Sequence, residues 1–487
     1  MMGRFELSAA IGVNKAFLVN HRDLINRIDP YYYKGAFHVL RKKLTAKGFV
    51  RLGAFVESWN RGDGPRDGFY TENSELGVYF LRVNNLQNHT IELDDVKYIN
   101  RIIHETKLKR TQVTAGDLIF AISGTKDNLG TVSIIPNHIQ EANLNSALVR
   151  FDLNNQIDKK FFCILFGLDF IRTQIEFTGK GAAQNNLNND EINSFLLPNL
   201  DLQVQKSLVL IYEQAIQRSR EKEQQAQTLL DGIDSYLLNE LGITLPQQDN
   251  RLEKRIFTVP FSEVTLSRAD PYFFQEHFVG FFESLKKSKY QVKTLSKISK
   301  KITSGITPLS GGDAYSVQDA GIPFIRSGDI DIDGNIDYSE LLYLQPSIHN
   351  SVMKSSKLIK NDLMIAIVGA TIGQVGIYLD DRDANINQAI ALVRLNEEIN
   401  HQYVKELIKS GVGQMSLNRL KRPVARANIN LEEISTMQIV LPPIEKQNEI
   451  AAHISQIRAQ AKQLQADAAQ VLATAKAEIE RMILGEA

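Results

Sequence analysis

The sequence Asp117-Leu-Ile-Phe-Ala-Ile-Ser-Gly124 (DLIFAISG) recurs 245 residues later as Asp362-Leu-Met-Ile-Ala-Ile-Val-Gly369 (DLMIAIVG). Both copies are short apolar runs bounded by Asp and Gly, a pattern that is typical of a buried β-strand. Two such similar runs at this distance indicate that a whole structural unit is repeated, because the period is too long for a solenoid. The repeat should therefore extend to both sides of the strand.

Further stretches recur at nearly the same distance. They are Arg27–Tyr33 with Arg268–Phe274, Gly77–Arg82 with Gly321–Arg326, Ala142-Asn143 with Ala384-Asn385, Asn186–Ile192 with Asn428–Ile434, and Gln205 with Gln447. A lag that stays within a few residues of 242 along the chain does not arise from composition bias. We therefore predict one architecture present twice in a pseudo-twofold arrangement, which suits a target with two similar halves.

Each copy ends in a segment with heptad spacing. Apolar or small residues alternate steps of four and three from Leu208 to Leu237, and again from Ile450 to Ile483. This spacing is typical of a coiled-coil seam. Pro198 and Pro442-Pro443 precede the two segments, and Gly242 follows the first, as expected at helix ends. The sequence therefore predicts two long helices.

Neither helix is expected to be stable alone, because Ser219 and Lys222 interrupt the first seam. Under the pseudo-twofold the helices would pair antiparallel and bury both seams. A helix over 205–241 would be about 55 Å long, more than one turn of B-DNA at roughly 34–36 Å. The helices could simply hold the halves together, but a loop-bearing domain at each end favours a molecular ruler.

The remainder of each copy predicts a mixed α and β domain. Short apolar runs such as 78–83 and 322–327 are expected strands, whereas 161–177 has helical spacing. The Gly-rich stretches 61–69 and 303–316 are expected loops, where recognition residues are usually placed. We predict an α+β fold with domains at 1–200 and 244–443, followed by long helices at 201–243 and 444–487.

Composition excludes several classes of protein. The chain is 43% apolar and 23% charged, which is ordinary for a soluble globular protein. Arg4 and Glu6 lie where the apolar core of a signal peptide would be, and the longest apolar run, 161–171, is too short to span a membrane. We therefore expect a cytoplasmic protein without a membrane segment. The single cysteine, Cys163, lies in that run and is expected to pack in the core.

Catalytic motifs are missing from the sequence. The Gly179-Lys-Gly181 stretch lacks the spacing of a phosphate-binding loop. The sequences Asp29-Pro-Tyr-Tyr and Asp270-Pro-Tyr-Phe have only one of the two prolines that an adenine methyltransferase needs, and we interpret them as structural turns. The nine histidines show no metal-ligand spacing. We predict no catalytic residue, no metal site and no cofactor site, so the chain is not expected to be an enzyme.

Several motifs together resemble the specificity subunit of type I restriction-modification systems. They are the helix start LPPIEKQNEI (441–450), the turn Gly305-Ile-Thr-Pro308 and the stretch from Gly321 to Ile330. The resemblance covers essentially the whole chain, and the second copy matches it better. In the first copy, Asn60–Arg66 (NRGDGPR) stands in place of the G-x-T-P turn, and Pro198-Asn-Leu-Asp-Leu-Gln replaces the usual helix start.

This resemblance implies that the two domains are target-recognition domains, each reading one half of a bipartite, asymmetric DNA site, with the helix pair as spacer. It also implies partners: two modification (methyltransferase) subunits and restriction (translocase/nuclease) subunits. S-adenosylmethionine, ATP and Mg²⁺ would be bound by those partners. The net charge of zero mildly favours an alternative, a duplicated coiled-coil scaffold that binds only protein partners.

Candidate DNA contacts are cations, amides and hydroxyls in the expected loops, because Lys and Arg bind phosphates while Arg, Asn and Gln read base edges. In the first domain they are Arg61, Arg66, Arg82, Asn84, Lys126, Lys180, Gln184 and Asn185; in the second they are Lys301, Thr303, Ser304, Thr307, Arg326, Ser327, Arg419, Lys421, Arg422 and Arg426. The run from Arg419 to Arg426 is the densest basic cluster among them.

Overall fold

The computed structural model describes residues 35–64, 69–72, 75–87, 90–178, 185–246, 249, 251, 253, 256–261, 264, 270–309, 312–421 and 427–486. The chain forms two compact units, unit 1 from 1–222 with 466–487 and unit 2 from 223–465. Both long helices, α6 (Leu202–Leu241) and α13 (Ile444–Leu484), are divided between the units. Each unit therefore holds one globular part and half of each long helix.

Among its described residues, unit 1 contains an antiparallel sheet, a mixed sheet and five short helices. Its helices are α1 (Gly35–Ala46), α2 (Arg101–Glu105), α3 (Lys159–Leu165), α4 (Asp169–Thr178) and α5 (Asn189–Asn193), of which α3 and α4 divide the expected helix 161–177. Its strands are β1 (Val50–Arg51), β2 (Val56–Arg61), β3 (Tyr70–Thr71), β4 (Gly77–Leu81), β5 (Leu86–Gln87), β6 (Thr90–Ile91), β7 (Lys97–Asn100), β8 (Gln112–Val113), β9 (Leu118–Ala121), β10 (Ser123–Gly124), β11 (Val132–Ile134), β12 (Ala142–Leu144), β13 (Leu148–Leu153), β14 (Asn185–Asn186) and β15 (Leu196–Leu197).

Unit 2 repeats this architecture. Its helices are α8 (Glu276–Lys286), α9 (Pro346–Asn350), α10 (His401–Lys409), α11 (Gly411–Leu420) and α12 (Leu431–Ser435). Its strands are β16 (Gln291–Thr294), β17 (Ser299–Ser304), β18 (Tyr315–Ser316), β19 (Ile322–Ile325), β20 (Leu342–Leu344), β21 (Lys357–Leu358), β22 (Leu363–Ala366), β23 (Val375–Ile377), β24 (Ala384–Ile386), β25 (Ile390–Leu395) and β26 (Gln438–Leu441).

The sheet topology shows the duplication directly. Unit 1 has a four-stranded sheet β11-β9-β13-β2 and a five-stranded sheet β3-β7-β4-β12-β8, and unit 2 has the same orders, β23-β22-β25-β17 and β18-β20-β19-β24-β21. In both five-stranded sheets the pairing of the third and fourth strands is parallel and the others are antiparallel. The predicted α+β fold with two similar domains, each followed by a long helix, is confirmed.

The repeated apolar runs are central strands of the four-stranded sheets. All four residues of β9, and all four of β22, are fully buried because each strand lies between two others and is covered on both faces. The core of unit 1 joins this sheet to α3, α4 and both long helices; its members include Phe120, Phe161, Leu208 and Ile479. Cys163 is a buried thiol of the same core, as predicted, and burial raises its pKa.

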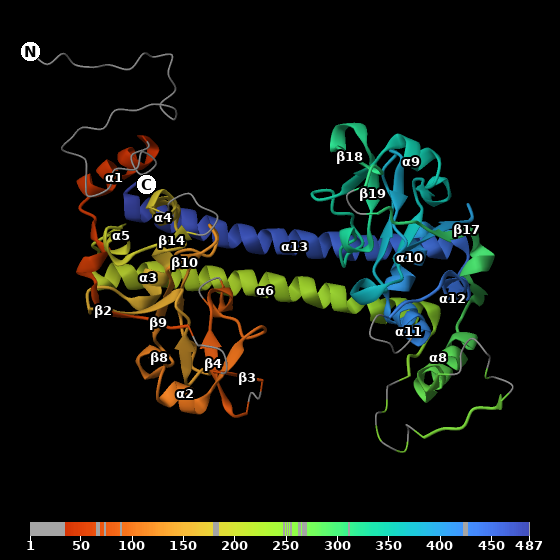
Figure 1. Cartoon of the computed structure of the whole chain (residues 1–487), viewed down its shortest axis with the longest axis horizontal. Helices are drawn as coiled ribbons and strands as arrows, with labels where there is room; N and C mark the ends of the chain where they lie inside the picture. The colour runs from red at the N-terminus through yellow and green to blue at the C-terminus, as the bar shows by residue number, and fades with distance from the viewer. Residues whose placement is uncertain are drawn as a thin grey trace, which may run out of the picture. The chain divides into compact units, whose positions relative to one another are not determined.

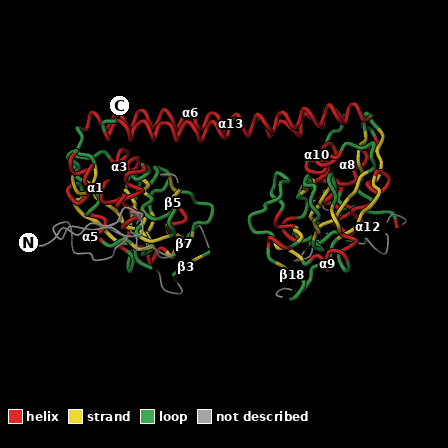
Figure 2. Tube along the Cα trace, turned by 90° about the horizontal axis from the view of Figure 1, so that it is seen from above, coloured by secondary structure: helices red, strands yellow, loops and turns green. Residues whose placement is uncertain are grey.

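The long helices run side by side in opposite directions (Figures 1 and 2). The seam residues expected from the sequence face inward: Leu208, Tyr212, Ala215, Ser219, Ala226, Ile233 and Leu237 are buried in α6, and Ile450, Ile454, Ala461, Ala468, Ala475, Ile479 and Ile483 in α13. Lys222 is tolerated in the seam because its Nζ forms an ion pair with Asp467 Oδ2 at 3.4 Å. Gly242 ends α6 with φ +66°, a conformation that glycine adopts without strain.

One pair of repeated residues, Gln205 and Gln447, attaches each globular part to its long helix. Gln205 is buried, accepts a hydrogen bond from the Asp158 backbone N at 2.8 Å and donates to two backbone carbonyls. Gln447 does the same in unit 2, with the Asn400 backbone N at 3.0 Å and the Pro442 carbonyl at 2.8 Å. Since a buried amide must be hydrogen-bonded, these glutamines fix how α3 and α10 meet the long helices.

Each unit also uses the far end of the other repeat's long helix. In unit 1, Glu480 of α13 accepts hydrogen bonds from the backbone N of Asp169 and Phe170, where α4 begins. In unit 2, Asp234 of α6 accepts one from the backbone N of Gly411, where α11 begins. These carboxylates occupy the position where a helix has free N–H groups and a favourable dipole. Each unit is therefore built from residues of both repeats.

Some local expectations need correction. Arg61 ends β2, Thr303 and Ser304 belong to β17, and 315–316 form β18, so the loops expected at 61–69 and 303–316 are shorter than predicted. The strand ends are polar and stand directly beside glycine-rich segments, so the sequence pattern does not separate strand from loop there. Asp270 caps the short 3₁₀ helix Pro271–Phe274 by accepting from the Phe273 backbone N, which confirms the turn; the equivalent Asp29 lies outside the described residues.

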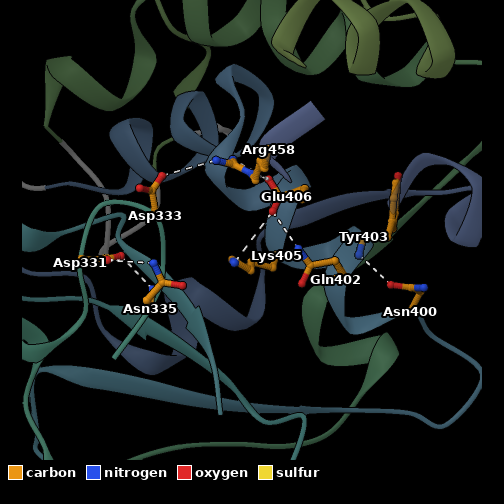
Figure 3. A network of polar contacts seen from close by, with 9 residues as sticks. All are labelled: Asp331, Asp333, Asn335, Asn400, Gln402, Tyr403, Lys405, Glu406 and Arg458. Atoms are coloured by element: carbon orange, nitrogen blue, oxygen red, sulfur yellow. Dashed lines mark hydrogen bonds and ion pairs between the residues drawn. The ribbon is translucent and has the colours of Figure 1, made fainter. Parts of the chain in front are cut away.

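A charged network joins α10 to α13 in unit 2 (Figure 3). The Glu406 carboxylate is 1% exposed and accepts from Arg458 Nη2 at 2.8 Å and from Gln402 Nε2 at 3.0 Å. Arg458 also reaches Asp333, Nη1 to Oδ1 at 3.5 Å, on the turn before β20. In unit 1 the residues 242 positions earlier are the apolar Ile164 and Ile216. These two equivalent positions are therefore charged in unit 2 and apolar in unit 1.

Lys409 lies beside this network with a buried Nζ that has no hydrogen-bond partner among the described residues. Burial, followed by repulsion from Arg458, lowers its pKa to about 8. An unfolded lysine titrates near pH 10.4. Below pH 8 both states carry the proton, and the folded state bears the full cost of the buried charge. Between about pH 8 and pH 10 the folded state loses its proton first, so stability gains with rising pH.

We therefore expect Lys409→Met to stabilise the protein at pH 7 and to lose that advantage toward pH 10. Because the side chain is partly exposed and water screens it, the gain should be about 1 kcal/mol. The measurement is the difference in urea midpoint between variant and parent at pH 7 and pH 10. A difference that stays constant over this range would show that the charge of Lys409 is not the cause.

Candidate nucleic-acid interface

Three segments meet at one edge of each unit. In unit 1 they are the end of β2, the β9–β11 connection with β10, and the residues leading into α5; β10 and β14 pair there, Ser123 with Asn186 and Gly124 with Asn185. In unit 2 the corresponding segments are joined by a bridge between Val368 and Asn428. We call these surfaces edge 1 (61–64, 122–128 and 185–191) and edge 2 (304–309, 367–373 and 427–433).

Each edge contains a glycine at a position where the backbone of another segment leaves no room for a side chain. A Cβ placed on Gly62 would lie 2.0 Å from the Asn145 carbonyl oxygen, and one on Gly305 would lie 1.7 Å from the Ile386 carbonyl oxygen. Both contacts are with backbone, which cannot move aside as a side chain can. Gly62 therefore takes the structural place of Gly305, although the sequence comparison treated 60–66 as a replacement of the G-x-T-P turn.

Edge 1 contains a pocket of about 490 Å³ lined by Arg61, Ile122 and residues 186–191. Asn188 and Glu191 form a capping box at the start of α5, each side chain hydrogen-bonded to the backbone N of the other. Asn430 and Glu433 repeat this box at the start of α12. The capping boxes explain why 186–192 and 428–434 are similar in sequence, and they fix the backbone at the rim of each edge.

The remaining candidate DNA contacts of unit 1 differ in their position and in their hydrogen-bond partners. Lys126 lies on edge 1 and forms an exposed ion pair with Glu176 at 2.8 Å. Arg82 lies after β4 and donates to the carbonyl and the carboxylate of Asp95, while Asn84 beside it is exposed. Asn185 is placed on edge 1 by the backbone pairing of β14. Arg66, Lys180 and Gln184 lie outside the described residues.

The second unit spreads its candidates over a strand and two loops. Lys301 Nζ donates to the Ser355 carbonyl at 2.6 Å, and burial lowers its pKa. Thr303 and Ser304 are half-buried at the end of β17, and Thr307 is exposed on edge 2 with its backbone N donating to Gln388 Oε1. Arg326 forms a two-nitrogen ion pair with Asp329, and Ser327 is half-buried beside it. Ser304 and Thr307 are thus the candidates found on edge 2.

The basic cluster predicted at 419–426 is divided by the structure. The Arg419 guanidinium stacks on the rings of Phe273 and Phe282, 3.9 and 4.4 Å from their centroids, and its Nε donates to the Phe273 carbonyl. Lys421 Nζ donates to Asn418 Oδ1, and burial lowers its pKa. Arg422 and Arg426 lie outside the described residues. They stand 242 positions after Lys180 and Gln184, so the two pairs are equivalent in the repeat.

Comparison with known proteins identifies this architecture. Residues 287–472 match the family model of the type I restriction modification DNA specificity domain. A solved chain from a study of complex assembly and conformational transition of the type I R-M system aligns with a TM-score of 0.52 and 17% identity, over 90% of this chain and 95% of that one. Residues 287–472 therefore resemble the type I restriction modification DNA specificity domain, and the chain as a whole shares the fold of that solved chain.

Two further solved specificity subunits align at lower TM-scores. The HsdS subunit from Thermoanaerobacter tengcongensis has a TM-score of 0.38 at 17% identity, covering 90% of this chain and 97% of that one. The S subunit from M. genitalium has 0.39 at 12% identity, covering 89% and 94%. No curated protein matches the chain. No helix among the described residues has the length and hydropathy needed to cross a membrane.

Sequence reasoning missed a buried histidine–asparagine pair that is present in both units. His104 Nδ1 lies within hydrogen-bond distance of Asn143 Oδ1, and His349 Nδ1 lies 2.6 Å from Asn385 Oδ1. Each asparagine donates its NH₂ to a backbone carbonyl, which orients its oxygen toward the histidine. The repeat contained the signal, since both the histidines and the asparagines recur at nearly the same lag.

Proposed function

We propose that this chain is a specificity subunit that reads a bipartite, asymmetric DNA site, with edge 1 on one half-site and edge 2 on the other. The observation that carries the proposal is that one edge is built twice on the same backbone with different side chains. Arg61 stands where edge 2 has Ser304, and each is followed by the glycine that contacts backbone. Because the two edges share one backbone arrangement, they can dock on a duplex in the same way. Because their side chains differ, they can contact different base sequences.

The long helices would set the spacer between the half-sites. At 1.5 Å per residue the 40 residues of α6 give a length of about 60 Å. Partner subunits would dock on the exposed outer faces of α6 and α13, where Leu210 is 55% and Met482 is 51% exposed. We propose two modification subunits and the restriction subunits as these partners, acting in the cytoplasm, with S-adenosylmethionine, ATP and Mg²⁺ bound by them.

Mapping methylated sites on DNA after co-expression of this chain with its modification subunit tests the proposal. A bipartite motif with two different halves and a fixed spacer is expected. The alternative, a scaffold without a DNA role, rests on the zero net charge. It predicts that the assembled complex methylates or binds DNA without sequence preference, or not at all. Methylation of a continuous motif would contradict the two-edge arrangement.

Arg422→Ala is expected to weaken DNA binding by the assembled complex and to make the affinity less dependent on salt. Loss of one phosphate contact should reduce the slope of log affinity against log salt by about one. Binding would be measured at several salt concentrations between about 50 and 200 mM, over which the affinity of such complexes for DNA changes strongly. Lys300→Ala is the control, since Lys300 is an exposed cation paired with Glu397. Identical slopes for Arg422→Ala and the parent would remove Arg422 from the interface.

A further inference from the structure

Among the candidate arginines and lysines whose side chains the structure describes, Arg61 differs from the others. Arg82 and Arg326 donate to carboxylates, Lys126 is paired with Glu176, and Arg419 is stacked between two rings. Lys301 donates to the Ser355 carbonyl, and Lys421 donates to Asn418 Oδ1. The Arg61 side chain is exposed, and its Nε is its single hydrogen-bonded nitrogen within the described ranges, donating to the Ser146 carbonyl at 2.9 Å. Its two terminal nitrogens remain available to a ligand.

The surroundings of Arg61 hold it in place before any ligand arrives. Its backbone pairs with Val149 in the four-stranded sheet, and the next residue, Gly62, is held against the Asn145 carbonyl. The hydrogen bond from Nε to the Ser146 carbonyl orients the guanidinium. A long side chain anchored in this way loses less conformational entropy on binding than a free surface arginine.

The pocket beside Arg61 has the composition of a base-reading site rather than a phosphate site. Besides Arg61 it is lined by the exposed amides of Asn186 and Asn189 and by the exposed carboxylate of Asp190. A carboxylate repels a phosphate but can accept a hydrogen bond from cytosine N4. Amides and a guanidinium present both donors and acceptors, which is what base edges in the major groove require.

We propose that Arg61 reads a guanine in the half-site bound by edge 1, with its two free nitrogens donating to the O6 and N7 atoms of that base. This inference rests on the proposed function and names the base class that one edge selects. The forked guanidinium matches the two acceptors of guanine, whereas adenine presents a donor at the position of O6. Edge 2 has Ser304 in the same place, so the guanine requirement is confined to one half-site.

The experiment maps methylation sites for complexes that contain Arg61→Ala, Arg61→Gln or the matched control Ser304→Ala. The parent motif should contain a G·C pair at one position of one half-site. Arg61→Ala should relax that position, with discrimination against other bases falling roughly 10- to 100-fold, while the other half-site stays unchanged. Arg61→Gln should shift the same position toward adenine, since glutamine pairs with adenine N6 and N7. Ser304→Ala should leave the guanine position intact.

Three outcomes would overturn the assignment. One is an unchanged motif in Arg61→Ala. Another is a uniform loss of affinity for all sequences with a reduced salt slope, which would make Arg61 a phosphate contact. The third is relaxation in both half-sites. Thermal unfolding of each variant complex controls for folding. If the parent complex itself shows no bipartite motif, the proposed function fails whatever Arg61 does, so the two failures are distinguishable.

Discussion

Arg458→Ala is expected to lower the free energy of unfolding by about 3 kcal/mol. The substitution removes the principal cation that faces the buried Glu406 carboxylate, and breaking one side of a buried ion pair typically costs 3–5 kcal/mol. The lower end applies because Lys405 Nζ remains 3.9 Å from Glu406 Oε1 and Gln402 still donates to that carboxylate. Urea denaturation, followed by the far-UV circular dichroism of the helices, measures the change.

Two further variants separate the charge from the packing. Arg218→Ala removes an arginine from the exposed face of α6 and should change stability by less than about 0.5 kcal/mol. The double variant Arg458→Ile with Glu406→Ile reproduces the apolar pair Ile164 and Ile216 of unit 1. It should recover part of the loss, because it removes the buried carboxylate together with its cation, while Lys405 loses its ion pair with Glu406. If Arg458→Ala cost no more than Arg218→Ala, the network of Figure 3 would contribute nothing to stability.

Gly305→Ala is expected to abolish recognition of one half-site. The added Cβ would lie 1.7 Å from the Ile386 carbonyl oxygen and 2.5 Å from its carbon, so the backbone of edge 2 must shift. Overpacking of this kind costs about 1–3 kcal/mol. The larger effect falls on function, since base contacts require groups held within about 0.5 Å of their positions. DNA binding by the assembled complex should drop at least about 100-fold.

Gly328→Ala is the matched control, because a Cβ at Gly328 meets no atom within 4 Å in the same unit. Gly62→Ala should produce the corresponding defect through edge 1, where the added atom lies 2.0 Å from the Asn145 carbonyl oxygen. Competition binding with duplexes altered in one half-site tells the two defects apart. Equal DNA binding by Gly305→Ala and Gly328→Ala would show that the close approach at edge 2 is not needed for recognition.

The candidate site could be predicted only in part from the sequence. A cation in a Gly-rich stretch is a reasonable DNA contact, and Arg61 and Arg419 met this criterion equally well. They separate only when their contacts are known. The Arg419 guanidinium lies over the rings of Phe273 and Phe282, more than 130 positions away in the sequence, whereas Arg61 donates to a backbone carbonyl. Asn186 was missed because its place beside Arg61 depends on the pairing of β10 with β14.

The sequence by itself determined the duplication, the α+β class, the two long helices and their seams. These features depend on periodicity, which is written along the chain: a lag near 242 for the repeat, and steps of three and four for the helices. Tertiary structure alone decided that each unit contains the far half of the other repeat's long helix. It also decided that unit 2 has Glu406 and Arg458 where unit 1 has isoleucines, and which arginine has terminal nitrogens available to a ligand. Those outcomes depend on contacts between residues far apart in the chain, and no local pattern encodes which charges will find partners.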